Sequence, residues 1–370
     1  MAQTPATLMR GGSSKCWIFD GRGLPDDRNR LAELLVETFG AADPHQLDGA
    51  GGGTSVTSKA AFVTPSAADD ADLDYLFAQV SVGEGIVEWG SNCGNCATAV
   101  ALWGVQELGL DKGGPTTAVR MRNVNTGSEI VAEVDTSAEP QPVSVPGVRG
   151  VGTGVDLTFR NPEGSSTGSL WPTRAHRSRM SVDGISMTIS MVDAGAPVVI
   201  IDAESLGISA AAGEEQVAQH VPMLRRVRAH AAVEMGIAPS IEQSFDAVPK
   251  VGIIGPPRDY TTTLGEDIRA GDYDVSVRML SMNAPHPTIG LTTAVAVALA
   301  STVPDSVLGE VGTVEKRPSA EDGETVHLRT VTLGTLGGLL RCEVRSRADQ
   351  TEVLLRRAAR RLAEAQLYLR

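Results

Sequence analysis

Two stretches of the chain are apolar at nearly every position instead of on one face. The first covers residues 97–108 and the second covers residues 292–299. A helix without a polar face must be surrounded by protein on all sides. The pattern therefore predicts two central helices, each enclosed by strands.

Segments near these helices recur in the same order in both halves of the chain. Three pairs match: LMRGGSSKCWIFD (8–20) with SMVDAGAPVVIID (190–202), TSKAAFV (57–63) with VPKVGII (248–254), and CATAVA (96–101) with LTTAVA (291–296). Their conserved order indicates a duplicated unit. We predict an α+β protein with two pseudosymmetric domains, 1–182 and 183–370. Each should be a mixed sheet or barrel around one central helix.

Three further segments complete the expected organisation. A helix should have Pro25, Asp26 and Asp27 at its start and should bury an apolar face of leucine and phenylalanine up to Phe39. Residues 136–182, rich in Pro, Gly, Ser and Arg, should connect the two domains. The stretch 349–368 is expected to form an amphipathic helix, with its arginines near the C-terminal end.

Composition restricts the classes of function that the chain can have. It contains 42% hydrophobic and 21% charged residues and has a net charge of −13, which argues against nucleic acid as a partner. No apolar run is long enough to span a membrane and the N-terminus lacks a signal-peptide core, so we expect a cytoplasmic protein. Four cysteines are too few for a disulfide framework.

The sequence SNCGNC at 91–96 leads directly into the first apolar helix. Cys93 would lie beside unpaired backbone N–H groups, where the helix dipole favours a thiolate and a bound carboxylate. Cys96, inside the helix, should be a buried small hydrophobe, as should Cys16 and Cys342. The C-x-x-C spacing also occurs in zinc and redox sites, but no second pair of ligands accompanies it, so we predict no metal.

The glycine-rich run 49–55 ends close to Lys59, an isolated charge among small and apolar residues. Backbone N–H groups of such a run can converge on an anion, with hydroxyl donors from Thr54 and Ser55. A tight turn between strands is the alternative. If Lys59 faces inward, desolvation favours the neutral amine, which can act as a general base. A solvated edge-strand lysine is the alternative, but a neighbouring Cys93 would make the two an acid–base pair.

Five motifs together resemble the PrpF family: LMRGGSSKC, GGGTSVTSK, SNCGNCATAV, NPEGSSTGSLWPT and SMNAPHPTIGLTTAVAV. That family includes methylaconitate cis-trans isomerase, methylitaconate delta-isomerase and 4-oxalomesaconate tautomerase, and it has a diaminopimelate epimerase-like fold. The resemblance implies a proton moved across an allylic system in a small di- or tricarboxylate, without a cofactor or metal. It also implies an active site between the two domains.

The family motifs place its lysine at Lys59 and its cysteine at Cys93, which implies that these two residues are catalytic. Other residues in the motifs, together with Arg278 just before the last of them, are expected to bind the substrate. They are Ser13, Ser14, Gly53, Thr54, Ser55, Asn92, Gly94, Asn95, Arg278, Ser281, His286 and Thr288.

Two departures from the family pattern limit the prediction. Thr288 occupies the place where epimerases of this fold carry a second cysteine, so racemisation by two thiols is not available. The chain also has RGGSSK for the usual RGGTSK, and a polar NCGNC, so the named substrates do not carry over directly. An epimerase or racemase of the same fold and a non-catalytic carboxylate-binding protein remain alternatives. The sequence leaves open whether the protein forms a homodimer.

Overall fold

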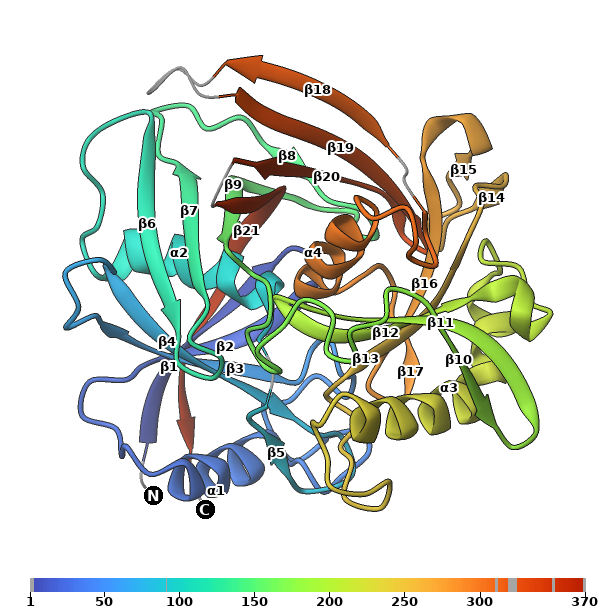
Figure 1. Ribbon diagram of the computed structural model, residues 1–370. Helices are drawn as coiled ribbons and strands as arrows, with labels where there is room; N and C mark the ends of the chain where they lie inside the picture. Colours follow the sequence, from blue (N-terminus) through green and yellow to red (C-terminus); the bar gives the residue numbers. More distant parts are fainter. Residues whose placement is uncertain (1–2, 91, 310–311, 319–324, 348–349, 369–370) are drawn as a thin grey trace. The chain divides into compact units, whose positions relative to one another are not determined.

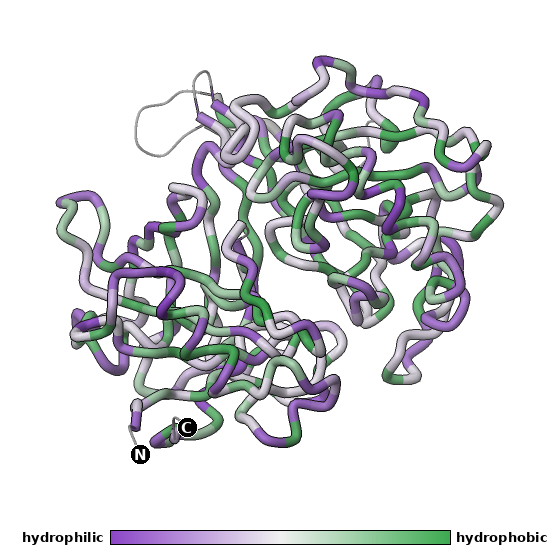
Figure 2. Tube along the Cα trace, turned by 90° about the horizontal axis from the view of Figure 1, so that it is seen from below, coloured by the Kyte–Doolittle hydropathy of each residue, from purple (hydrophilic) through white to green (hydrophobic). Residues whose placement is uncertain are grey.

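The computed structural model describes residues 3–90, 92–309, 312–318, 325–347 and 350–368, which form two compact units (Figure 1). Unit 1 comprises Met1–Val145, Gly150–Leu157 and Arg356–Arg370, and unit 2 comprises Pro146–Arg149 and Thr158–Leu355. Each unit has its own apolar core. Along the chain, hydrophilic segments lie mainly in the outer loops of each unit (Figure 2).

Unit 1 is a ring of strands around a single helix, α2 (Gly94–Glu107), in which residues 94–105 are all buried. Its strands are β1 (Gln3–Gly11), β2 (Ser14–Asp20), β3 (Lys59–Pro65), β4 (Leu73–Val80), β5 (Val87–Glu88), β6 (Thr116–Asn123), β7 (Glu129–Asp135), β8 (Val143–Ser144), β9 (Val151–Arg160) and β21 (Thr351–Tyr368). In the described part of this unit the pairings run β1, β2, β3, β4, β6, β7, β9, β21 and back to β1. The closed ring explains why α2 needs no polar face.

Helix α1 (Arg28–Phe39) confirms the predicted helix, but it begins after Asp27 instead of at Pro25. The Asp27 carboxylate caps it by accepting the Asn29 backbone N–H at 2.9 Å. The helix ends at Gly40, whose φ of 63° is a left-handed conformation that glycine adopts without steric cost. Leu31 and Phe39 lie in its buried face.

Unit 2 surrounds the second apolar helix, α4 (Leu291–Ala300), which is buried along its whole length. Its other elements are β10 (Ser178–Val182), β11 (Ile185–Ala194), β12 (Ala196–Asp202), η1 (Ala203–Leu206), α3 (Glu214–Glu234), β13 (Lys250–Gly255), β14 (Tyr260–Thr261), β15 (Asp267–Ile268), η2 (Ala270–Asp272), β16 (Val275–Ser281), β17 (Ala284–Pro285), β18 (Thr313–Pro318), β19 (Thr325–Thr335) and β20 (Gly338–Ser346). Helix α4 packs against β11, β12 and β20.

The two units share one strand topology, which confirms the duplication predicted from the sequence. In unit 1 the successive pairs β1–β2, β2–β3, β3–β4, β4–β6 and β6–β7 alternate between antiparallel and parallel. In unit 2 the pairs β11–β12, β12–β13, β13–β16, β16–β19 and β19–β20 alternate in the same way. The aligned residues Lys59 and Lys250 each begin the third strand of their series.

The C-terminal segment does not form the predicted amphipathic helix. Residues 351–368 are the long strand β21, which pairs antiparallel with β1 from Gln3 opposite Tyr368 to Gly11 opposite Ala359. The Ala-, Leu- and Arg-rich sequence favours a helix locally. As a strand, however, this segment forms hydrogen bonds with backbone groups of β1 that would otherwise be exposed at an open sheet edge. Because of this strand, residues 356–370 belong to unit 1. Residues 158–182 belong to unit 2, so the units differ from a division at 182/183.

Candidate active site in the first unit

Lys59 faces the interior of unit 1 at the start of β3, and its side chain is only 7% exposed. It lies directly opposite Gln79 in the antiparallel β3–β4 pair. The Lys59 Nζ donates a hydrogen bond to Gln79 Oε1. The ring of Phe77, two residues earlier on β4, lies 5.4 Å from the amine. The inward orientation expected for Lys59 is therefore the one that the structure has.

The glycine-rich run before Lys59 is held by a buried glutamine, Gln46. Its Oε1 accepts the Gly53 backbone N–H at 2.8 Å and its Nε2 donates to the Ser58 hydroxyl at 2.8 Å. The Thr54 N–H and hydroxyl both contact the Thr57 hydroxyl. The backbone N–H groups of Gly53 and Thr54 therefore already donate to protein side chains. The run forms a turn held by these bonds, and neither N–H group is left to bind an anion.

Cys93 is the N-cap residue of α2 and is partly buried, whereas Cys96 and Cys16 are buried. The side chains of Cys93 and Cys96 are hydrogen-bonded, as are those of Cys96 and Cys16. The hydrogen bond to Cys96, followed by burial, raises the pKa of Cys93 well above its ordinary value, while the nearby charge of Lys59 acts in the opposite direction. Burial, followed by the bond to Cys16, likewise raises the pKa of Cys96.

Two influences act on the pKa of Cys93 in opposite directions. The helix dipole favours a thiolate at Cys93, whereas the hydrogen bond to Cys96 and desolvation raise the pKa of the thiol and favour its protonated form. Cys16, Cys96 and Cys342 are all buried, as predicted. A protonated thiol suits a group that donates a proton, whereas a thiolate suits a nucleophile or a base.

The N-terminal end of α2 also holds two asparagine side chains with unused hydrogen-bonding groups. Asn92 Oδ1 accepts the hydroxyl of Tyr75 at 2.8 Å, and Asn95 Nδ2 donates to the hydroxyls of Ser13 and Ser14 at 3.3 and 3.4 Å. Asn92 Nδ2 and Asn95 Oδ1 are buried without a partner among the described residues. Because buried polar groups are nearly always paired, these two amides mark this end of α2 as a site for a polar ligand. Gly94 lies between them as the first residue of the helix.

The predicted site residues of unit 2 make contacts within that unit. The guanidinium of Arg278, 1% exposed, donates to the carbonyls of Ala212, Val277 and Gly334. Burial lowers the pKa of Arg278 to about 10. His286 Nδ1 accepts the Thr288 backbone N–H at 3.0 Å, which orders the turn before α4.

Ser281 ends β16, and its side chain is partly buried. Arg278, Ser281, His286 and Thr288 stay predicted substrate contacts. Nε and Nη1 of Arg278 bind backbone carbonyls within unit 2, whereas its Nη2 is buried without a partner among the described residues.

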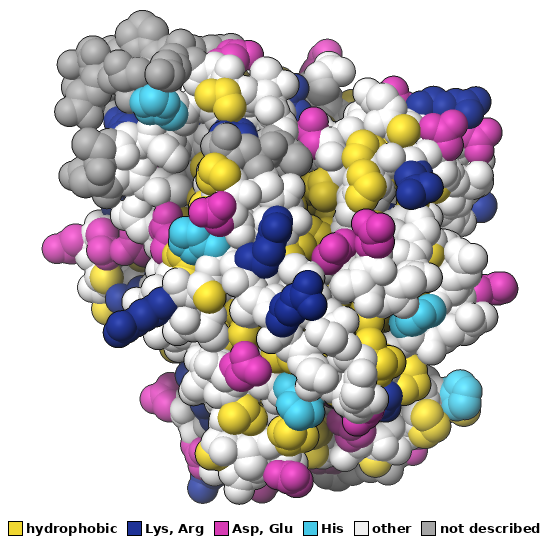
Figure 3. Space-filling model, turned by 45° about the vertical axis from the view of Figure 1, so that its right-hand side comes forward, with side chains coloured by type: hydrophobic (Ala, Val, Ile, Leu, Met, Phe, Trp, Pro, Cys, Tyr) yellow, Lys and Arg dark blue, Asp and Glu magenta, His cyan; other side chains and the backbone are white. Residues whose placement is uncertain are grey.

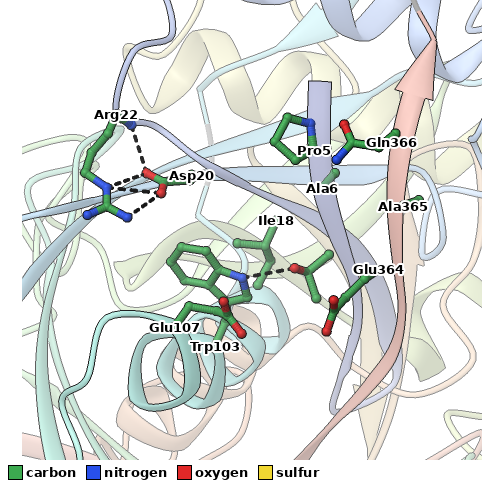
Figure 4. A pocket seen from close by; sticks show the side chains of 11 residues that line it. Pro5, Ala6, Ile18, Asp20, Arg22, Trp103, Glu107, Glu364, Ala365 and Gln366 are labelled. Atoms are coloured by element: carbon green, nitrogen blue, oxygen red, sulfur yellow. Dashed lines mark hydrogen bonds and ion pairs between the residues drawn. The ribbon is translucent and has the colours of Figure 1, made fainter. Parts of the chain in front are cut away.

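Unit 1 also has an open pocket of about 420 Å³ away from Lys59 and Cys93 (Figure 4). Trp103 lies at the pocket and donates to the Thr7 hydroxyl at 3.2 Å. Figure 4 shows Arg22 paired with Asp20, and the carboxylates of Glu107 and Glu364 near Trp103. This acidic lining would repel an anionic substrate, so the pocket does not compete with the α2 N-terminus as the candidate site.

The surface charge does not attract an anionic carboxylate substrate over a long distance. On the face shown in Figure 3, Lys and Arg side chains are interspersed with Asp and Glu, and the net charge is −13. Within the described part of the chain, no three His, Cys, Asp or Glu side chains are grouped to hold a metal ion. Among the same residues, no helix has both the length and the apolar character needed to cross a membrane.

Comparison with known proteins identifies the family. A family model described as PrpF protein matches residues 1–370. The chain belongs to the PrpF family. It is 32% identical to 2-methyl-aconitate isomerase of Shewanella oneidensis, over 82% of this chain and 82% of that protein. It is 34% identical to 4-oxalomesaconate tautomerase of Pseudomonas putida, over 83% of this chain and 82% of that protein.

A solved structure of the same kind confirms the predicted fold class. The crystal structure of methylitaconate-delta-isomerase aligns with a TM-score of 0.76 and 27% identity, over 100% of this chain and 96% of that one. These PrpF relatives are isomerases and tautomerases by name, so the family resemblance read from the five motifs is confirmed as well.

Sequence reasoning missed three residues that organise the site: Gln46, Tyr75 and Gln79. Two of them carried a signal, because Tyr75, Phe77 and Gln79 alternate along β4 and must share one face of the strand. Lys59 and Asn92 both bind to that face. The contacts of Gln46, by contrast, depend on how the glycine-rich run folds back, which no local pattern shows.

Proposed function

We propose that the protein is a cofactor-independent isomerase that moves a proton across an allylic system in a small unsaturated di- or tricarboxylate. Candidate substrates are a methylaconitate, aconitate, an itaconate and oxalomesaconate. The observation that carries the proposal is the pairing of two different proton carriers in unit 1. The Lys59 amine is near enough to Cys93 to act electrostatically on its thiol, and Asn92 and Asn95, which flank Cys93 and Gly94 in the sequence, each have one buried side-chain amide atom without a partner among the described residues.

The proposed reaction needs one group to remove a proton and another to supply one. Lys59, as the neutral amine, removes a proton from a carbon γ to a carboxylate, and the electron pair of the C–H bond passes into an extended enolate. Cys93 then gives its thiol proton to the carbon at the other end of the allylic system. The double bond has moved, no atom is gained or lost, and a proton passing from the Lys59 ammonium to the Cys93 thiolate restores the enzyme. A general acid–base pair of this kind typically contributes about 10²–10⁴-fold per group.

Local donors would bind the carboxylates and stabilise the enolate. In unit 1 the proposal uses the hydroxyls of Ser13 and Ser14, the Asn92 amide and the N–H groups that begin α2 at Gly94 and Asn95. Fixed donors and a helix N-terminus stabilise developing negative charge without reorganisation, which is usually the largest catalytic contribution. The proposal keeps a cytoplasmic location, where the four free cysteines would stay reduced.

The test combines ultraviolet absorbance with solvent deuterium incorporation for each of the four candidate substrates. An isomerase changes both signals. A racemase of this fold exchanges deuterium with little change in absorbance, and a carboxylate-binding protein changes neither signal.

Lys59→Ala and Cys93→Ser should each lose at least about 100-fold in kcat. Lys59→Ala also leaves the buried Gln79 Oε1 without its donor, so its free energy of unfolding should fall by about 1–3 kcal/mol while the protein stays folded. Lys112→Ala, at an exposed lysine of unit 1, and Cys342→Ala, at a buried cysteine of unit 2, are the matched controls. If Lys59→Ala retained more than about half of the wild-type activity, the proposed mechanism would be wrong.

A further inference from the structure

We propose that Gln79 is a positioning residue for Lys59, whose side-chain oxygen holds the amine at the point from which it exchanges a proton with the substrate. The inference rests on the proposed function of Lys59. A lysine amine ends a flexible four-carbon chain, so burial alone does not place it. Gln79 Oε1 accepts a hydrogen bond from that amine, and the two residues lie opposite each other in the β3–β4 pair.

The carboxamide of Gln79 cannot turn away from Lys59, because its other end is already bound. Gln79 Nε2 donates to the carbonyl oxygens of Ser58 at 3.1 Å and Ser55 at 3.2 Å. A rotated amide would place its oxygen against these two carbonyl oxygens and lose both bonds. The side chain is 4% exposed, so water does not offer an equal alternative.

The groups that bind Gln79 are themselves held in place. Ser58 also binds Gln46 through its hydroxyl, and Gln46 binds the Gly53 backbone N–H on the far side of the turn. The ring of Phe77 confines the amine from the same face of β4. One chain of contacts therefore runs from Gly53 through Gln46, Ser58 and Gln79 to Lys59. Such support for a reacting group is worth a large factor, since a displacement of about 1 Å can cost 10²-fold in rate.

Two substitutions separate positioning from a merely structural role. Gln79→Leu removes the acceptor, so kcat should fall roughly 10- to 100-fold at every pH, with KM changed less than about threefold. Gln79→Glu keeps one oxygen toward Lys59 and adds a negative charge, which favours the protonated amine, while its second oxygen loses the two bonds to the Ser55 and Ser58 carbonyls. The acidic limb of the kcat/KM profile should then move to higher pH by roughly one unit or more, with activity recovering as the pH rises.

The measurements use the full chain and whichever of aconitate, methylaconitate, methylitaconate or oxalomesaconate the wild type turns over fastest. Gln366→Leu, at an exposed glutamine of β21, is the matched control and should match the wild type. Melting curves show whether each variant is folded. If Gln79→Leu fails to fold, the pH profile of the nearly isosteric Gln79→Glu decides.

Three results would overturn the inference: a Gln79→Leu variant within twofold of wild-type kcat, equal losses in both variants with no shift of the pH profile, or a loss confined to KM. The result for Lys59→Ala shows which idea has failed. If Lys59→Ala is inactive and the Gln79 variants are normal, only the positioning role is wrong. If Lys59→Ala is active, the proposed function itself is wrong.

Discussion

The contact between β1 and α2 allows one sharp prediction about the stability of unit 1. A Cβ added at Gly11 would lie 1.9 Å from the carbonyl oxygen of Asn95 and 2.9 Å from the backbone nitrogen of Ala99. Ordinary contact begins at 3.4 Å, so the strand and the helix would have to separate by about 1.5 Å. Both atoms belong to the backbone of α2, so no side-chain rotation can relieve the overlap in Gly11→Ala.

The magnitude follows from the cost of overpacking, which is typically about 1–3 kcal/mol. Because a helix backbone must move, we expect the upper end, about 3 kcal/mol. For a unit of this size each kcal/mol shifts the melting temperature by about 2–4 °C, so Gly11→Ala should melt roughly 6–12 °C below the wild type. The same displacement moves the α2 N-terminus that carries Cys93, and kcat should fall by up to about 10²-fold.

Differential scanning calorimetry and the isomerase assay measure the two effects. Gly114→Ala is the control, because an added Cβ there meets its nearest atom at an ordinary 3.4 Å. It should melt no lower than the wild type and at most about 4 °C above it, since the expected gain from removing a glycine is only about 0.4–1 kcal/mol. If Gly11→Ala melted within about 2 °C of the wild type, β1 would not lie against the first turn of α2 and the site geometry would be wrong.

Two further predictions concern the same helix end. In Tyr75→Phe the buried Asn92 Oδ1 loses its donor, so the free energy of unfolding should fall by about 1–3 kcal/mol; an unchanged urea midpoint would contradict the contact. Iodoacetamide should modify Cys93 before the buried Cys16, Cys96 and Cys342, but slowly at neutral pH. The reason is that a pKa raised well above the ordinary value leaves little thiolate there. Mass mapping should show that the rate of Cys93 labelling rises steeply through alkaline pH. A bound tricarboxylate should slow the labelling because it covers the thiol. Fast labelling at pH 7 or preferential labelling of Cys96 would refute this account.

The large-scale fold was readable from the sequence because it depends on patterns that persist over many residues. Two helices that are apolar on every side had to be enclosed by protein. The repeated order of similar segments predicted two related units. The isolation of Lys59 among small and apolar residues allowed either an inward or a solvated edge-strand position, and the structure has the inward one. Local information failed for residues 351–368, where helix-favouring side chains form a strand because β1 needs a partner.

The chemistry of the site was only half determined by the sequence. The motifs named Lys59 and Cys93, and the spacing of the second cysteine put Cys96 inside the helix. The protonation of Cys93 depends instead on a hydrogen bond to Cys96 and on burial, which a helix-dipole argument does not contain. The glycine-rich run looked like an anion cradle, but Gln46 takes the Gly53 N–H.

What the sequence by itself determined is the set of family motifs, which predict Lys59 and Cys93 as the catalytic residues, and that two similar units fold around apolar helices. Periodicity and motif order are properties of the chain, so they can be seen before it folds. Only the tertiary structure decided how Lys59 is held, because Gln79 meets it across a strand pair and Gln46 meets Ser58 through a folded turn. Such contacts join residues through space, and a hydrogen bond of this kind forms only when the fold brings its two ends within about 3 Å.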